Sequence, residues 1–239
     1  MMSNGQNQRY AIYFAGAPQG DFWNLGSQWL SRCAAGRFME TLPESLGVDP
    51  LVLEKMTSQP RRYGWHATLK APFSLKEGFL FEDLHQRLNL LVHELHAFEL
   101  PTLELRVMKD FLALTPVKST QLYPQLVDVG NQCVQRLHPL ARPLNENEIA
   151  YRKRVDLNPR EEALMLQWGY PFVQELFEFH FTLSNSLSLY DASEVSSLIK
   201  AAKIWFKLTQ PISFDRISLF VEEKRGENFM FLRDYSFTS

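Results

Sequence analysis

Two segments of this sequence alternate apolar and polar side chains from one residue to the next. They span 64–72 and 177–184, and each carries the pattern His-x-Thr-Leu, at 66–69 and at 180–183. A period of two restricts a segment to a β-strand that buries one face. Each strand is therefore expected to turn its apolar residues toward a core and its His and Thr toward an open groove.

The rest of the chain repeats one order of elements in its two halves. Alternation predicts further strands at 10–14, 103–107, 111–114, 212–221 and 229–235. Apolar residues at helical spacing predict helices after Asp21 and Asp49, over 81–95 and 122–137, and after Asn158 and Asp191. Residues 138–158 show no periodicity and are expected to be a polar connector of the kind that often forms a lid.

In each half the order is strand, helix, short helix, strand, helix, strand. We therefore predict an α+β fold with two pseudo-symmetric lobes, whose antiparallel sheets are flanked by helices around a central groove. The length of 239 residues suits one bilobal domain over 9–239, and the polar residues 1–8 are expected to be disordered.

Charge and cysteine content narrow the partners and the compartment. The net charge of −2 argues against binding to long nucleic acid and leaves room for a small phosphorylated substrate. Cys33 and Cys133 form no CxxC pair, so we expect buried free thiols in a reducing compartment. No apolar run is long enough for a membrane span and no signal peptide is recognisable, so the predicted location is the cytoplasm. The oligomeric state does not follow from the sequence.

The two motifs suit acid–base chemistry on a phosphate. An imidazole titrates near pH 6.5, so one histidine can act as base while the other acts as acid. Such a pair gives a bell-shaped pH profile, expected to peak at roughly pH 6.5–8. The hydroxyls of Thr68 and Thr182 can donate to nonbridging phosphate oxygens. The plainer interpretation, two groove histidines without chemistry, is disfavoured because His66 and His180 hold the same place in a repeated order.

Three stretches of the chain resemble one known superfamily. They are Arg9–Phe14, Arg61–Phe73 and Trp168–Pro171, together with the doubled His-x-Thr-apolar motif. The chain resembles the two-histidine (2H) phosphoesterase superfamily, which includes bacterial RNA 2′,3′-cyclic phosphodiesterases. Within it, the chain is most similar to a branch associated with phosphonate-utilisation operons. It departs from the usual pattern at two core positions, with Trp65 in place of Phe and Phe181 in place of Met.

The resemblance implies an enzyme that opens or closes a small cyclic phosphodiester without a metal ion. His66 and His180 would be the acid–base pair, with their individual roles left open, and Thr68 and Thr182 would hold the phosphate. A ribosyl or nucleotide cyclic phosphate is the substrate class it suggests. Two alternatives stay open: a nucleotide or RNA-end binding module without turnover, and an RNA-end ligase or cyclase.

Further polar residues near the motifs are candidates for substrate binding, although each could equally be an ordinary surface or strand-end residue. These candidates are Tyr13, Arg62, Tyr63, Lys70, Arg152 and Arg154. The spacing of His85, His93 and His96 does not match a metal-binding pattern, so we predict no metal and no cofactor.

Overall fold

The computed structural model describes residues 8–40, 42–118, 120–153, 156–207 and 210–238. Arg154, a predicted substrate-binding residue, lies outside these ranges, as do residues 1–7 of the segment predicted to be disordered. Gln8 is described, and its side-chain amide donates a hydrogen bond to the Glu223 carboxylate.

The described residues form nine strands and eight α-helices, and consecutive elements are often of the same kind. The strands are β1 (Arg9–Phe14), β2 (Ala67–Phe73), β3 (Phe98–Glu99), β4 (Leu103–Met108), β5 (Phe111–Pro116), β6 (Phe181–Ser186), β7 (Ser213–Phe214), β8 (Arg216–Glu222) and β9 (Met230–Ser236). The α-helices are α1 (Asp21–Trp29), α2 (Pro50–Met56), α3 (Ser58–Tyr63), α4 (Phe81–Val92), α5 (Tyr123–Leu137), α6 (Glu146–Arg152), α7 (Pro159–Trp168) and α8 (Ala192–Trp205). Short 3₁₀ helices are η1 (Glu44–Leu46), η2 (His138–Leu140), η3 (Gln174–Leu176) and η4 (Leu187–Leu189).

Within the described residues, seven strands form one antiparallel sheet in the order β4-β5-β6-β2-β1-β8-β9. The junction between β6 and β2 is narrow, because a single registered pair, Ala67 with Phe181, joins these two strands. The sheet thus consists of β4-β5-β6 and β2-β1-β8-β9, which meet where the two motifs lie. The predicted α+β class and antiparallel pairing are confirmed, while the pseudo-symmetry of two lobes stays a prediction.

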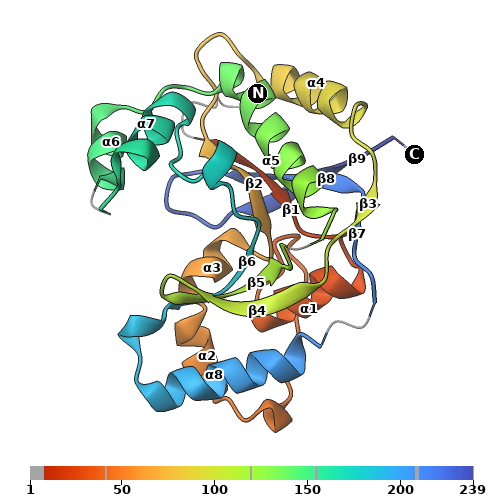
Figure 1. Cartoon of the computed structure of the whole chain (residues 1–239), viewed down its shortest axis with the longest axis vertical. Helices are drawn as coiled ribbons and strands as arrows, with labels where there is room; N and C mark the ends of the chain where they lie inside the picture. The colour runs from red at the N-terminus through yellow and green to blue at the C-terminus, as the bar shows by residue number, and fades with distance from the viewer. Residues whose placement is uncertain (1–7, 41, 119, 154–155, 208–209, 239) are drawn as a thin grey trace.

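Helices cover the sheet at both ends of the molecule. In Figure 1, α4 to α7 gather at one end of the long axis and α1, α2 and α8 at the other, with the sheet between them. The main core joins apolar residues of the sheet with those of α4, α5 and α8. A second cluster lies around Tyr13 and Trp23, on the face of β1 that also carries Arg9 and Ala11.

Several boundaries differ from those expected. The connector 138–158 contains η2 and the helix α6, because Asn145 and Glu148 form a reciprocal capping box that starts a helix without an apolar stripe. Helix α1 begins at Asp21 itself, and Gly20 occupies the cap position. Strand β2 starts at Ala67 because α3 extends to Tyr63, and β6 starts at Phe181. Each motif histidine therefore directly precedes its strand.

Other expectations are met. Cys33 and Cys133 are buried and free. The helices after Asp49, Asn158 and Asp191 are each capped by that side chain. Across the part of the chain that the structure describes, every helix is too short or too polar to cross a membrane.

Candidate active site

The two motifs lie side by side in the middle of the sheet. Ala67 and Phe181 are registered partners and both are completely buried on the core face. Because neighbouring residues on a strand point to opposite faces, the residues before and after this pair point away from the core. In the antiparallel register these crosswise neighbours are His66 with Thr182 and Thr68 with His180. Two motifs 114 positions apart in the chain thus form one polar cluster, as the sequence predicts.

Both imidazoles are held in the same way. Nδ1 of His66 lies 2.8 Å from the carbonyl oxygen of Gly64, and Nδ1 of His180 lies 2.7 Å from that of Glu178. A carbonyl oxygen only accepts, so Nδ1–H is the donor in each case. Nε2 of each neutral ring then carries the lone pair that can accept a proton.

The position of the Gly64 carbonyl depends on glycine. The backbone φ of Gly64 is +77°, in the left-handed region, and a Cβ there would lie 2.8 Å from the Cβ of Ala34. Another residue would therefore be both strained and crowded. This glycine ends α3 and turns its carbonyl toward the first motif histidine.

The two histidines differ in their electrostatic surroundings. Burial and, to a smaller extent, the nearby His180 lower the pKa of His66 to about 4, although the hydrogen bond to Gly64 raises it. Burial also lowers the pKa of His180, but the backbone carbonyl and the carboxylate of Glu178 both oppose this. Glu178 itself is paired with Lys118 at 2.5 Å. In the unliganded protein burial thus favours the neutral form of both imidazoles, and only His180 has a neighbouring carboxylate that opposes this.

Aromatic rings pack against both histidines. The ring of Tyr13 lies 4.0 Å from that of His66 between centroids and is only 1% exposed. Tyr63 lies 5.9 Å from His66, and Phe111 lies 5.7 Å from His180. Tyr13 therefore lies behind His66 and supports its ring, whereas the sequence suggested a substrate contact.

A cavity of about 320 Å³, which we call the groove pocket, opens beside the second motif. Thr68 and His180 line it, with basic and aromatic side chains around them. These are Arg106, Lys109, Phe111, Tyr170 and Phe172. No hydrogen bond joins the hydroxyl of Thr68 or Thr182 to another described residue, so both are free to donate to a ligand.

The remaining predicted residues fall into two groups. Arg62 pairs with the buried carboxylate of Glu222 and donates to the Glu227 carbonyl at 3.0 Å, so it braces the β8–β9 turn. Lys70 and Arg152 line a second cavity, of about 170 Å³, which Tyr170 separates from the groove pocket. The structure therefore places Lys70 and Arg152 around one cavity beside the motif cluster, and their role in substrate binding stays a prediction.

Sequence reasoning missed the side chains that complete these two cavities. Tyr170 lines both of them, and Arg9 and His138 line the second. Arg9 had a detectable signal, because it shares a strand face with Tyr13 at the period of two. His138 begins the short 3₁₀ helix η2 and Tyr170 lies in the loop after α7, and neither segment is long enough for a periodicity to indicate the direction of a side chain.

Comparison with known proteins places the chain in a family. A family model described as "Protein of unknown function (DUF1045)" matches residues 68–230. The chain belongs to this DUF1045 family. The match contains Thr68 and the whole second motif.

Two curated relatives are similar in sequence to most of this DUF1045 chain. Both are described as "Ribose 1,5-bisphosphate phosphokinase PhnN", one from Janthinobacterium sp. (strain Marseille) and one from Laribacter hongkongensis (strain HLHK9). Each is 35% identical, over 96% and 94% of this chain respectively. The chain spans about half the length of these relatives, 51% of each.

A solved structure described as "Crystal structure of phosphoesterase" covers 98% of this chain and is itself covered completely, at 13% identity and a TM-score of 0.38. A likeness at this score bears on neither the fold nor the activity of the DUF1045 chain.

Proposed function

We propose that this chain opens a small cyclic phosphodiester by acid–base catalysis between His66 and His180, without a metal ion. The observation that carries the proposal is the matched pair of imidazoles, each held through Nδ1 by the carbonyl two residues earlier. Both leave Nε2 for proton transfer, and the free hydroxyls of Thr68 and Thr182 flank them. A binding module would not require two equivalent, oriented imidazoles.

The proposed roles follow from the electrostatic difference. His66, whose pKa is about 4, is the base, and its Nε2 takes a proton from the attacking water. The new oxygen–phosphorus bond forms as the bond from phosphorus to one ring oxygen breaks. His180, beside the Glu178 carboxylate, is the acid and protonates the departing oxygen through Nε2. The product is an open phosphate monoester with a free hydroxyl.

The comparisons support a sugar phosphate as the substrate class. The name of the two relatives specifies a ribose with two phosphates as the molecule that those proteins phosphorylate. We do not extend their kinase activity to this chain, because none of its eleven glycines is followed by lysine and the GxxxxGK[ST] phosphate-binding pattern is absent. A ribosyl cyclic phosphate, in the phosphonate metabolism that the sequence resemblance suggests, is the proposed substrate.

The test is a panel of ribosyl and nucleotide cyclic phosphates assayed with excess EDTA, with the products identified by ³¹P NMR. We expect at least one ester to open at an unchanged rate in the chelator. Activity that disappears in EDTA and returns with zinc or manganese would rule out the metal-free mechanism. Tight binding of a cyclic ester without turnover would instead favour the binding module.

The pH dependence should reflect the buried imidazoles. For kcat/KM, which reports the free protein, activity should fall in acid as His66 is protonated near pH 4. It should fall again as His180 loses its proton below its usual value of 6.5. The optimum thus lies more acidic than the sequence alone suggests. With an anionic ester bound, both pKa values rise, so the kcat profile should lie at higher pH. A kcat/KM plateau that continues to about pH 9.5 would contradict this pair.

A further inference from the structure

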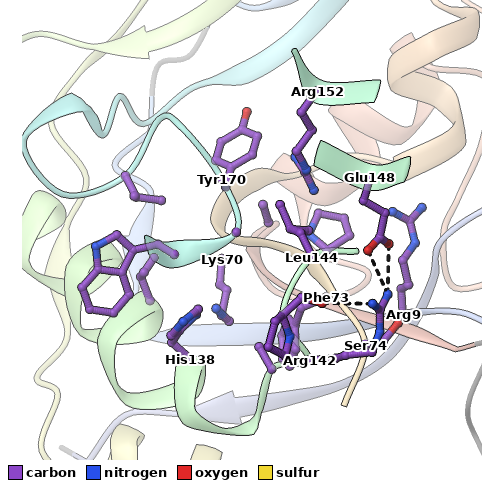
Figure 2. Close-up of a pocket in the computed structure, with 18 of the residues that line it drawn as sticks. Arg9, Lys70, Phe73, Ser74, His138, Arg142, Leu144, Glu148, Arg152 and Tyr170 are labelled. Carbon is purple, nitrogen blue, oxygen red and sulfur yellow. Dashed lines mark hydrogen bonds and ion pairs between the residues drawn. The ribbon is translucent and has the colours of Figure 1, made fainter. Parts of the chain in front are cut away.

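The second cavity, which we call the basic pocket, is walled by β2, the end of α5, α6 and the chain after α7. Figure 2 shows its polar side chains, which come from β1 and the loop after η2 as well as from these elements. Four of them are cationic and one is acidic. These are Arg9, Lys70, Arg142 and Arg152, with Glu148 as the acid. The charge of Glu148 is already compensated, because its carboxylate accepts from Arg142 at 3.0 Å and from Arg225 at 2.8 Å.

Lys70 is the unusual member of the basic pocket. It is only 3% exposed, yet among the described residues its ammonium group has no hydrogen bond and no carboxylate partner. Its nearest cation–π contact is the ring of Phe73, 4.8 Å from Nζ. A buried charge without a counter-ion is costly, and burial lowers the pKa of Lys70 to about 8. At neutral pH the group still carries its charge.

A second unpartnered polar atom belongs to His138, which lines the same cavity. Nδ1 of His138 is buried and has no hydrogen-bond partner in the described part of the chain. In Figure 2, His138 lies next to Lys70, and its pKa is lowered first by burial and then by the Lys70 charge. Arg152 approaches from α6 with its guanidinium 5.8 Å from the centre of the Tyr170 ring, and no carboxylate pairs with it among the described residues. Lys70, His138 and Arg152 therefore all line the basic pocket, and each carries a potential hydrogen-bond donor without a partner among the described residues.

We propose that the basic pocket binds a phosphate monoester, held by Lys70 and Arg152. A phosphate group supplies the negative charge that Lys70 lacks and accepts several hydrogen bonds at once. A carboxylate is a poorer match, because it has fewer acceptor oxygens for donors arriving from three elements.

A second step rests on the proposed function: this phosphate belongs to the same molecule whose cyclic phosphodiester is opened in the groove. Tyr170 lines both cavities, and so do Ala71 and Val173, so the two spaces are adjacent. Thr68 lines one and Lys70 the other, two residues apart on β2, or about 7 Å of strand. One sugar ring with a phosphate at each end spans such a distance. The substrate class is thus a sugar cyclic phosphate that bears a second, terminal phosphate.

The first test measures binding by calorimetry in the His66→Ala protein, in which turnover is expected to be strongly reduced. Ribose 5-phosphate should bind and ribose should not. Lys70→Met should weaken ribose 5-phosphate binding by roughly 10- to 100-fold, the loss typical for a hydrogen bond to a charged group. The exposed Lys76, six residues along the chain, supplies the matched control: Lys76→Met should leave binding unchanged. Equal binding of ribose and ribose 5-phosphate, or no effect of Lys70→Met, would overturn the subsite.

Folding is monitored by the melting temperature, which Lys70→Met should not lower because it removes an unpaired buried charge and keeps an unbranched side chain. Arg152→Gln, at the end of α6, provides an independent variant with the same expected loss of binding.

The second test compares turnover of a ribosyl cyclic phosphate with and without a 5-phosphate. The 5-phosphate should raise kcat/KM by roughly 10- to 100-fold in the native protein, and Lys70→Met should abolish that advantage. If the 5-phosphate still raises kcat/KM in Lys70→Met, the proposal that both phosphates belong to one substrate is wrong. It is also wrong if inorganic phosphate binds as tightly as ribose 5-phosphate and does not compete with the cyclic ester. If every cyclic ester is inert while ribose 5-phosphate binding depends on Lys70, the proposed function fails and the subsite is supported.

Discussion

Replacing His66 or His180 by Ala is expected to lower kcat by roughly 10²- to 10⁴-fold in each case. Each change removes one of the two proposed proton transfers and leaves the hydroxyls of Thr68 and Thr182 in place. The double variant should be little worse than either single one, because the acid and the base act in the same step and their effects do not add.

The measurement is kcat on whichever cyclic ester the panel identifies, with melting temperatures to establish folding. His93→Ala is the matched control, since His93 is exposed at the end of α4 and takes no part in the site. Near-normal turnover by either motif variant would remove that histidine from the mechanism. Fully additive losses would indicate that the two residues act in separate steps.

Gly26→Ala is expected to destabilise the fold by on the order of 3 kcal/mol, although alanine is the better helix former. Gly26 lies in α1, and a Cβ at this position would come within 1.8 Å of the indole of Trp65. The indole cannot move aside, because it stacks on Phe181 at 4.6 Å and on Phe206 at 5.6 Å between ring centroids. Trp65 directly precedes His66, so activity should fall together with stability.

A double-mutant cycle tests this explanation. Trp65→Phe alone should cost about 1–2 kcal/mol through the space that it leaves. In the Gly26→Ala background the same change should be favourable, because the smaller ring makes room for the new methyl group. The free energy of unfolding is measured by urea denaturation, and Gln28→Ala, elsewhere on α1, should change it by less than about 0.5 kcal/mol. Additive losses in the cycle would show that Gly26 and Trp65 do not compete for space.

This pair also explains a departure noted in the sequence. The resemblance leads us to expect Phe before the first motif histidine, and this chain has Trp65. A larger ring fits here because the facing helix carries glycine at position 26. The sequence contains both residues, but only their contact in the fold connects them.

The features that could be predicted from the amino-acid sequence are those that a local period or a helix cap encodes. Alternation at 66–69 and 180–183 was enough to predict which face of each motif strand is buried, since side-chain direction on a strand is a local property. The caps at Asp49, Asn158 and Asp191 were equally readable, because each side chain bonds to backbone only two or three residues ahead. The cluster of two histidines and two threonines followed from these strands.

The strand register, the pKa shifts of the histidines and the burial of Lys70 could not be predicted in this way, because they depend on contacts between residues far apart in the chain. Register at one pair, Ala67 with Phe181, sets each His across from the other motif's Thr, and no local pattern encodes that pairing. The lowered pKa values of His66 and His180 arise from burial, and their different neighbours are brought in by folding. From the sequence, Lys70 is expected to be an ordinary lysine near the end of a strand. In the fold, α5, α6 and the loop after α7 surround it, so that its charge is buried without a partner among the described residues.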